Sequence, residues 1–435
     1  MICCHAETLR RKRNPEVTLK LSWKALILCA ALAASAAPGR TAERYRRLPA
    51  REYLDKMKAG WIGQIIGVSW GAPTEGKFKT IMPAEKMPPF SEDLVNKAFN
   101  QDDLYVEMTF LRSLEQYGLD VPIRQAGIDF ANSRYALWVA NRAGRSNLRK
   151  GIAPPDSSHP NFHKSAGAID YQIEADYAGL IAPGMPGAVI ALGEKFGRLM
   201  NYGDGVYAGQ FMGCLYAEAF FETKIDKLIQ AGLECIPQQS MYAGMVRDMV
   251  RWRRENPKNW ERTWELVDRK YRQDRNYYVS PLDVKLEGAF VLMGLLYGKR
   301  DPDQTMIIST RCGSDSDCNP SSAAGVLFTS MGIAKLPPRY YAKLDETKIF
   351  SYTAYDFPRL MAVCDKLARL LLVKAGGRIE TNSRGEEIFA IPVRKPAPSV
   401  FEDIKNPGPA AGSLFTGAEK ALIVEKDPPP APKSK

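Results

Sequence analysis

Two aspartates separated by one residue form the most suggestive segment of the chain. Asp315 and Asp317 lie in the run 311–320, which follows the apolar residues 306–308 and precedes a stretch rich in Ser and Ala. Two carboxylates two residues apart in a loop can converge on one cation, whereas on a regular helix they would diverge. The pair is therefore interpreted as candidate metal ligands, and the alternative is an exposed Asp-rich turn.

A second pair of acids opens a predicted helix. Asp102 and Asp103 begin the segment 102–117, in which apolar residues recur at helical spacing and Gly118 is a natural stop. The free N–H groups and the dipole of a helix N-terminus favour acidic residues, so helix capping is one explanation. Two neighbouring acids are more than one cap requires, which favours a second role as ligands.

Three further segments contain candidate residues for a site. Glu75 lies in a Gly- and Pro-containing turn after an apolar helical segment, where a solvated side chain is the alternative. Asp176 lies beside an apolar stretch, and a surface acid on an amphipathic helix is the alternative there. Gly203, Asp204 and Gly205 form a turn into a predicted helix, whose N-terminus could receive a phosphate group or simply end a plain loop.

The composition indicates which metals such a site would hold. Only three His occur, and none is paired at zinc-ligand spacing in a convincing context. Five cysteines follow the predicted leader, an odd and sparse set that does not form a disulfide framework. Any metal must therefore be held by oxygen, which favours Mg²⁺, Ca²⁺ or Mn²⁺.

The formal net charge of +11 fits a polyanionic substrate, and it fits a solvated surface equally well. No basic run is interleaved with aromatic residues in a recognisable module, so the sequence does not indicate nucleic-acid binding. After the N-terminal leader, no run of about 18 apolar residues could span a membrane.

The N-terminus has the features of a signal peptide. Basic residues precede the apolar stretch 25–34, and small residues follow with a cleavage site near Ala36 and Ala37. The sequence thus predicts a leader over 1–37 and an exported, periplasmic or secreted protein; a buried helix is the alternative. Residues 38–50 are predicted to be a short basic linker.

Helical periodicity dominates the region that follows. We predict one helical domain over 51–376, with helices near 102–117, 187–200, 205–222, 225–234, 239–255, 258–272, 283–298, 320–331 and 357–375. Two alternating segments flanking a turn predict a β-hairpin over 377–396. The Pro-rich remainder, 397–435, is predicted to be disordered.

In chain order, the acidic segments resemble the motifs of the ADP-ribosylglycohydrolase family, which includes the dinitrogenase reductase-activating glycohydrolase. The first motif stands here as residues 60–75, GWIGQIIGVSWGAPTE, the second as 101–104, QDDL, and the last as 313–319, GSDSDCN. The resemblance covers about residues 52–375. It implies an all-α fold, a large orthogonal helical bundle, here with the small C-terminal β-hairpin as an extension.

The resemblance also implies a metal centre with two Mg²⁺ ions, or Mn²⁺ ions, that orient the ribose of an ADP-ribosyl substrate. Its metal ligands would be Asp102, Asp103, Asp315 and Asp317, and its catalytic residues Glu75 and Asp103. Gln101, Asp176, Gly203, Asp204, Gly205, Cys318 and Asn319 are the candidate substrate-binding residues. Glycoside cleavage needs a carboxylate to activate water or protonate the leaving group, and clustered acids need cations to neutralise them.

Some residues depart from the family motifs. Ser69 replaces an Asp, Gln101 and Leu104 replace two Thr, and Cys318 replaces a Thr that often contributes a ligand. A thiol is a poor partner for Mg²⁺, which leaves the occupancy of the second metal position open. Two functions therefore remain: a hydrolase for a small or protein-linked ADP-ribose-like substrate, and an exported binding module with lost or altered hydrolysis.

Overall fold

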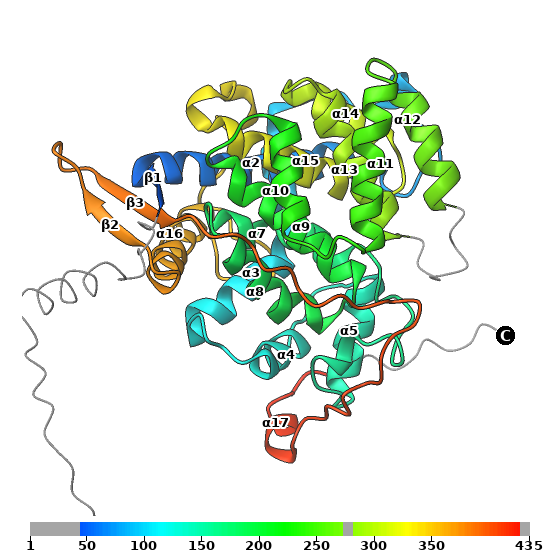
Figure 1. The fold of residues 1–435 in the computed structure, drawn as a ribbon, viewed down its shortest axis with the longest axis vertical. Helices are drawn as coiled ribbons and strands as arrows, with labels where there is room; N and C mark the ends of the chain where they lie inside the picture. Colours follow the sequence, from blue (N-terminus) through cyan, green and yellow to red (C-terminus); the bar gives the residue numbers. More distant parts are fainter. Residues whose placement is uncertain (1–43, 273–281, 427–435) are drawn as a thin grey trace, which may run out of the picture. The chain divides into compact units, whose positions relative to one another are not determined.

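The computed structural model describes residues 44–272 and 282–426, and these residues form a bundle of helices with one small sheet (Figure 1). The predicted leader, its cleavage site and the start of the linker lie outside the described residues. The main helices are α2 (Ala50–Gly71), α3 (Asp102–Tyr117), α4 (Ile123–Ala131), α5 (Val139–Arg149), α6 (Asp170–Ile173), α7 (Asp176–Leu180), α8 (Pro186–Phe196), α9 (Asp204–Ala219), α10 (Ile225–Glu234), α11 (Met241–Glu255), α12 (Trp260–Val267), α13 (Val284–Tyr297), α14 (Pro302–Arg311), α15 (Cys318–Met331) and α16 (Phe357–Lys374). The predicted all-α class is confirmed.

The centre of the bundle is the pair α2 and α15, which pack against each other more extensively than any other two described elements. Small residues allow this close approach. A Cβ atom at Gly67 would lie 2.4 Å from the carbonyl oxygen of Pro320, and one at Gly63 would lie 2.6 Å from the backbone of Ala324. The Gly and Ala residues of these two helices therefore bring the start of α15 beside the end of α2, where the first and last acidic motifs lie.

Two further helices surround this pair and are buried along almost their whole length. α13 is buried at every position and packs on α14, α11 and α15. α9 packs on α6, α7, α8 and α10. A helix that is apolar all round belongs in the core of a large domain, which explains why both sequences lack a clear polar face.

A three-stranded antiparallel sheet joins the start of the described chain to a region near its end. Its strand order is β1 (Tyr45–Pro49), β3 (Glu387–Pro392) and β2 (Arg378–Thr381). The predicted C-terminal hairpin is thus present. β1 lies within residues 38–50, which were predicted to be a linker. This part of the chain is a strand instead, because Tyr45 pairs with Pro392, which is far away in the sequence. A strand of five residues with a partner this distant leaves no local signal.

The described part of the region predicted to be disordered, 397–426, is instead held on the bundle. It runs beside α8, α9, α5 and α4 and ends after the short helix α17 (Gly417–Ala421), drawn in red in Figure 1. Ile404, Phe415 and Ile423 are buried, and Thr416 with Glu419 forms a capping box. Three apolar anchors spaced along a polar, Pro-rich segment are too sparse for a periodicity, but they suffice to hold it on the bundle.

One disulfide is present in the described part of the chain, between Cys214 of α9 and Cys235 just after α10. This disulfide was not predicted, because a single bridge within an odd set of cysteines has no spacing signature. Cys312, Cys318 and Cys364 are free and buried. No helix within the described ranges is both long enough and apolar enough to cross a bilayer.

Candidate metal centre

The N-terminus of α3 places two carboxylates side by side. Gln101, half-buried, is the extended residue before the helix, and Asp102 and Asp103 are its first two residues. Asp103 is fully buried, and neither of its carboxylate oxygens has a hydrogen-bond partner among the described residues. Helix capping therefore does not account for Asp103, because a capping carboxylate would accept a backbone N–H.

The second acidic pair lies in the turn between α14 and α15, residues 312–317, hereafter the Asp-rich turn. Gly313 and Ser314 adopt positive φ angles of 76° and 61°, so the chain reverses before Asp315. Asp315 and Asp317 are both buried, and Asp317 is the residue that precedes α15. Because Gly313 lies against the backbone oxygens of Phe78 and Thr80, a side chain at this position would displace the turn.

Glu287 of α13 holds this turn in place. Its Oε1 atom accepts a hydrogen bond of 2.5 Å from Oγ of Ser314, and its Oε2 atom accepts one of 2.8 Å from Nδ2 of Asn319 and a longer one from the backbone of Asp315. Glu287 was not among the site residues predicted from the sequence. The available signal was a lone acid in the first turn of an otherwise apolar helix, which must find partners when it is buried.

The two acidic pairs meet at Cys318, the first residue of α15. Ligand atoms of Asp102, Asp103 and Cys318 lie within 4.8 Å of one another, and so do those of Asp315, Asp317 and Cys318. The structure therefore brings together the four aspartates that the sequence predicted as metal ligands. Asp103 and Asp315 carry buried oxygens without a partner, and a divalent cation would supply the missing charge and coordination.

Burial sets the protonation of this cluster when no cation is bound. It raises the pKa of Asp102 to about 6 and that of Asp317 to about 7, and the charge of Glu75 contributes to both shifts. The pKa values of Asp103 and Asp315 are raised well above the usual value, first by burial and then by neighbouring aspartates. Burial likewise raises the pKa of the Cys318 thiol. Burial and mutual repulsion disfavour the charged form of these carboxylates, and a bound cation would compensate for both effects.

Glu75 lies on an exposed turn beside the cluster. The backbone N–H of Gly76 donates to the carbonyl of Ser314 at 3.1 Å, and the Thr74 and Ser316 hydroxyls are 2.8 Å apart. The 72–82 segment is therefore tied to the Asp-rich turn although the two are far apart in the sequence. Glu75 is the exposed carboxylate of the site, and its charge acts on Asp102 and Asp317.

Asp176, predicted to bind substrate, lies in the interior. Its Oδ2 atom accepts hydrogen bonds from the Tyr216 hydroxyl at 2.7 Å and the Ser322 hydroxyl at 3.3 Å, and its Oδ1 atom has no partner among the described residues. Its charge is the largest neighbouring influence on Glu107, which is one helical turn from Asp103 on α3. Asp176 and Glu107 thus extend the group of buried acids from the metal centre into the interior. This extension was not predicted from the sequence.

Gly203, Asp204 and Gly205 are not brought to the acidic cluster by any described contact. The Asp204 carboxylate, almost fully buried, accepts the backbone N–H of Tyr242 at 2.8 Å. The N–H of Gly203 faces Oε2 of Glu402 at 3.4 Å. This helix N-terminus, predicted to be able to receive a phosphate, therefore already faces a carboxylate of the chain itself.

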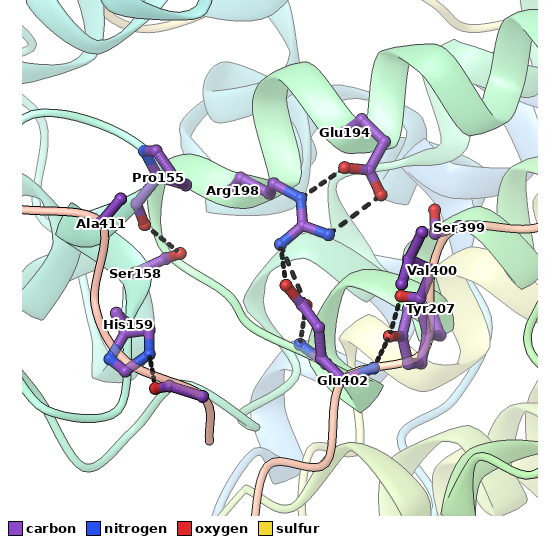
Figure 2. A network of polar contacts seen from close by, with 12 residues as sticks. Pro155, Ser158, His159, Glu194, Arg198, Tyr207, Ser399, Val400, Glu402 and Ala411 are labelled. Carbon is purple, nitrogen blue, oxygen red and sulfur yellow. Dashed lines mark hydrogen bonds and ion pairs between the residues drawn. The ribbon is translucent and has the colours of Figure 1, made fainter. Parts of the chain in front are cut away.

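Figure 2 shows how Glu402 is held there. Both of its carboxylate oxygens accept from Arg198, at 2.9 and 3.0 Å, and Arg198 also pairs with Glu194 of α8. The backbone N–H of Glu402 donates to the Tyr207 hydroxyl at 2.7 Å. These contacts fix the 393–426 segment on the bundle, so the region around Gly203 has a structural role in this arrangement.

The comparison with family models agrees with the motifs. The sequence model of the family described as ADP-ribosylglycohydrolase matches residues 49–375, a range that includes Glu75 and all four aspartates. No curated protein matches the chain. A solved structure described as an ADP-ribosylglycohydrolase-related protein complex is similar, with 14% identity, a TM-score of 0.46, and coverage of 74% of this chain and 99% of that one. The family match confirms the resemblance predicted from the motifs: this chain belongs to the ADP-ribosylglycohydrolase family.

Proposed function

We propose that this protein is a metal-dependent hydrolase that cleaves the glycosidic bond of an ADP-ribosyl or related ribosyl group. The observation that carries the proposal is that Asp102 with Asp103, and Asp315 with Asp317, form two groups that share Cys318 and contain buried oxygens without partners among the described residues. Family membership supports a glycohydrolase, and the donor set supports the metal dependence.

The four aspartates, Glu75 and Glu287 would have different roles. The four aspartates would hold two divalent cations, which when bound would supply positive charge and a template for the hydroxyls of a ribose. Glu75 is exposed and adjacent to the cluster, so it can reach a substrate from the solvent side and move a proton to or from the scissile bond. Glu287 would act as a positioning residue for the Asp-rich turn.

The first experiment measures release of free ADP-ribose from arginine- and serine-linked ADP-ribosylated protein by residues 38–435. We expect release with Mg²⁺ or Mn²⁺, loss with EDTA, and loss in Asp315→Asn/Asp317→Asn. Asp226→Asn on the exposed face of α10 is the control and keeps full activity. Release that persists with EDTA would contradict the proposal.

Glu75 is tested separately from the metal. Glu75→Gln should lower kcat by about 10²- to 10⁴-fold, the usual contribution of a general acid or base, while ADP-ribose still binds. Glu85→Gln, an exposed glutamate further along the same segment, should leave kcat unchanged. Equal loss of binding and turnover in Glu75→Gln would assign this residue to binding.

The second candidate function is a binding module for ADP-ribose or a nucleotide sugar that hydrolyses slowly or not at all. The hydroxyl of Ser69, which stands where the family motif has an Asp, is buried without a partner among the described residues. Titration calorimetry with ADP-ribose and Mg²⁺ distinguishes the two functions. Tight binding by the wild-type protein without any turnover would favour the module.

A further inference from the structure

Cys318 lies between the two pairs of metal-binding candidates. Its Sγ atom belongs to the group formed with Asp102 and Asp103 and also to the group formed with Asp315 and Asp317. It is 3.8 Å from Oδ1 of Asp317 and is buried. A cation that joins one carboxylate from each pair would therefore have the thiol sulfur within reach.

The surroundings of the thiol point independently to a ligand. Asp103 is fully buried, and both of its oxygens lack a hydrogen-bond partner among the described residues; Oδ2 of buried Asp315 lacks one as well. Asp103 belongs to one of the two groups that share the sulfur, and Asp315 belongs to the other. The donor set is thus several carboxylates and one sulfur, not carboxylates alone.

This donor set matches a different class of cation from that expected for an all-oxygen site. Mg²⁺ takes hard oxygen ligands, whereas sulfur selects softer ions, and Zn²⁺ accepts thiolate and carboxylate together. We infer that the cation bound beside Cys318 is a thiolate-coordinated divalent transition ion of the Zn²⁺ or Co²⁺ class, in preference to Mg²⁺. The inference rests on the metal centre of the proposed function and names the identity of one of its ions.

The other free cysteines allow a clean experiment. Cys312 is buried at the end of α14, where its carbonyl accepts the Trp264 indole N–H, and Cys364 is buried in α16; neither belongs to a metal-binding group. Cys214 and Cys235 are joined in the disulfide. In the chain from residue 38 onward, Cys312→Ser/Cys364→Ser therefore leaves Cys318 as the one free thiol.

Co²⁺ is the spectroscopic probe, because a cobalt–thiolate bond gives a near-ultraviolet charge-transfer band that carboxylate ligands do not. Metal-free protein is titrated with Co²⁺, and the expected result is this band in the wild type and in Cys312→Ser/Cys364→Ser. Cys318→Ser and Cys318→Thr should lose the band, and circular dichroism checks that both are folded. Both should bind Zn²⁺ at least about tenfold more weakly, since even loss of an outer partner costs that much, with Mg²⁺ affinity unchanged or higher.

The outcomes separate this inference from the proposed function. Co²⁺ binding without a thiolate band in Cys312→Ser/Cys364→Ser would overturn the inference and leave a metal-dependent hydrolase with oxygen ligands. A wild-type site that prefers Mg²⁺ to Zn²⁺ would overturn it as well. Failure of the wild type to bind any of these cations would overturn both.

Discussion

The side chain of Asn319 donates a hydrogen bond of 2.8 Å to Glu287, although the two residues are 32 positions apart and on different helices. This bond joins the first turn of α15 to α13, and the same carboxylate receives the Ser314 hydroxyl. The geometry of the Asp-rich turn therefore depends on Glu287, which is itself neither a proposed metal ligand nor a proposed substrate-binding residue. Residues of this kind set how well a site holds its metal.

Replacing Glu287 by Ala should lower the affinity for Mn²⁺ or Zn²⁺ roughly 10- to 100-fold, because the donors of Ser314 and Asn319 lose their acceptor. Glu287→Gln retains one acceptor oxygen and should lie between Ala and the wild type. Titration calorimetry measures both, with the exposed Glu265→Ala on α12 as control. An unchanged affinity in Glu287→Ala would mean that the turn holds its shape without this residue.

The contact between α2 and α15 leaves no room for a methyl group at Gly67. Gly67→Ala should lower the free energy of unfolding by about 1–3 kcal/mol or more, since the new Cβ would meet the backbone of Pro320 at 2.4 Å. In Gly244→Ala on α11, the Cβ meets nothing within 4 Å, and the helix should gain about 0.5–1 kcal/mol. Urea denaturation tests the opposite signs; a gain in both variants would refute the tight contact.

The disulfide between Cys214 and Cys235 closes a loop of 21 residues. Replacing both cysteines by Ser should lower the free energy of unfolding by about 3 kcal/mol, mainly because the unfolded chain regains freedom. Thiol titration of the unfolded protein from residue 38 onward should find three reactive groups before reduction and five after it. Five groups without a reductant would show that the bond does not form.

Export of the protein stays a prediction, and the same bond bears on it, because disulfides persist in oxidising compartments. Fractionation of cells that produce the full chain, together with the N-terminal sequence of the product, measures it. We expect the processed chain outside the cytoplasm, beginning near Ala36 or Ala37. A full-length product in the cytoplasm would contradict the predicted leader.

Asp204 should make stability depend on pH. Burial raises its pKa in the folded protein to about 6 from the usual 3.8. Between these values the folded state binds more protons than the unfolded state, so stability falls as pH rises and the full cost is present above about pH 6.

Asp204→Asn stays neutral and can still accept the N–H of Tyr242. Its stability relative to the wild type should therefore rise between pH 4.5 and 7.5, by about 1.4 kcal/mol per pKa unit. Urea denaturation of both proteins at the two pH values measures the difference. A gap that does not change with pH would refute the shift.

The sequence predicted well those parts of the molecule that depend on local pattern. The helix over 102–117 has its predicted bounds, because its apolar spacing, its acidic start and Gly118 agree with one another. The Asp-rich turn was recognisable for a similar reason: two acids flanked by an apolar run and by small residues form a local motif. The structure then brings both segments to one point.

The remaining features depend on partners that are far apart in the sequence. Glu287 is the one acid of α13, and Glu107 is one of four acids on α3. Only the packing of neighbouring helices shows what these two side chains contact. Asp176 was predicted to face a substrate, but its hydrogen bonds to Tyr216 and Ser322 lie inside the bundle. The direction in which a buried acid points is set by tertiary packing, which a single sequence does not encode locally.

The described segment 393–426 contacts helices that lie far earlier in the sequence. Arg124 pairs with Glu419, 295 positions away, and Asn132 accepts the N–H of Val424, 292 positions away. Contacts of such long range form only after the intervening chain is available and are entropically slow to close. The contacts of α4 and of the residues after it therefore cannot be completed before residues 419–424 have been synthesised. Proteolysis within 397–426 would expose α4 and α5 while leaving every residue of the metal centre in the molecule.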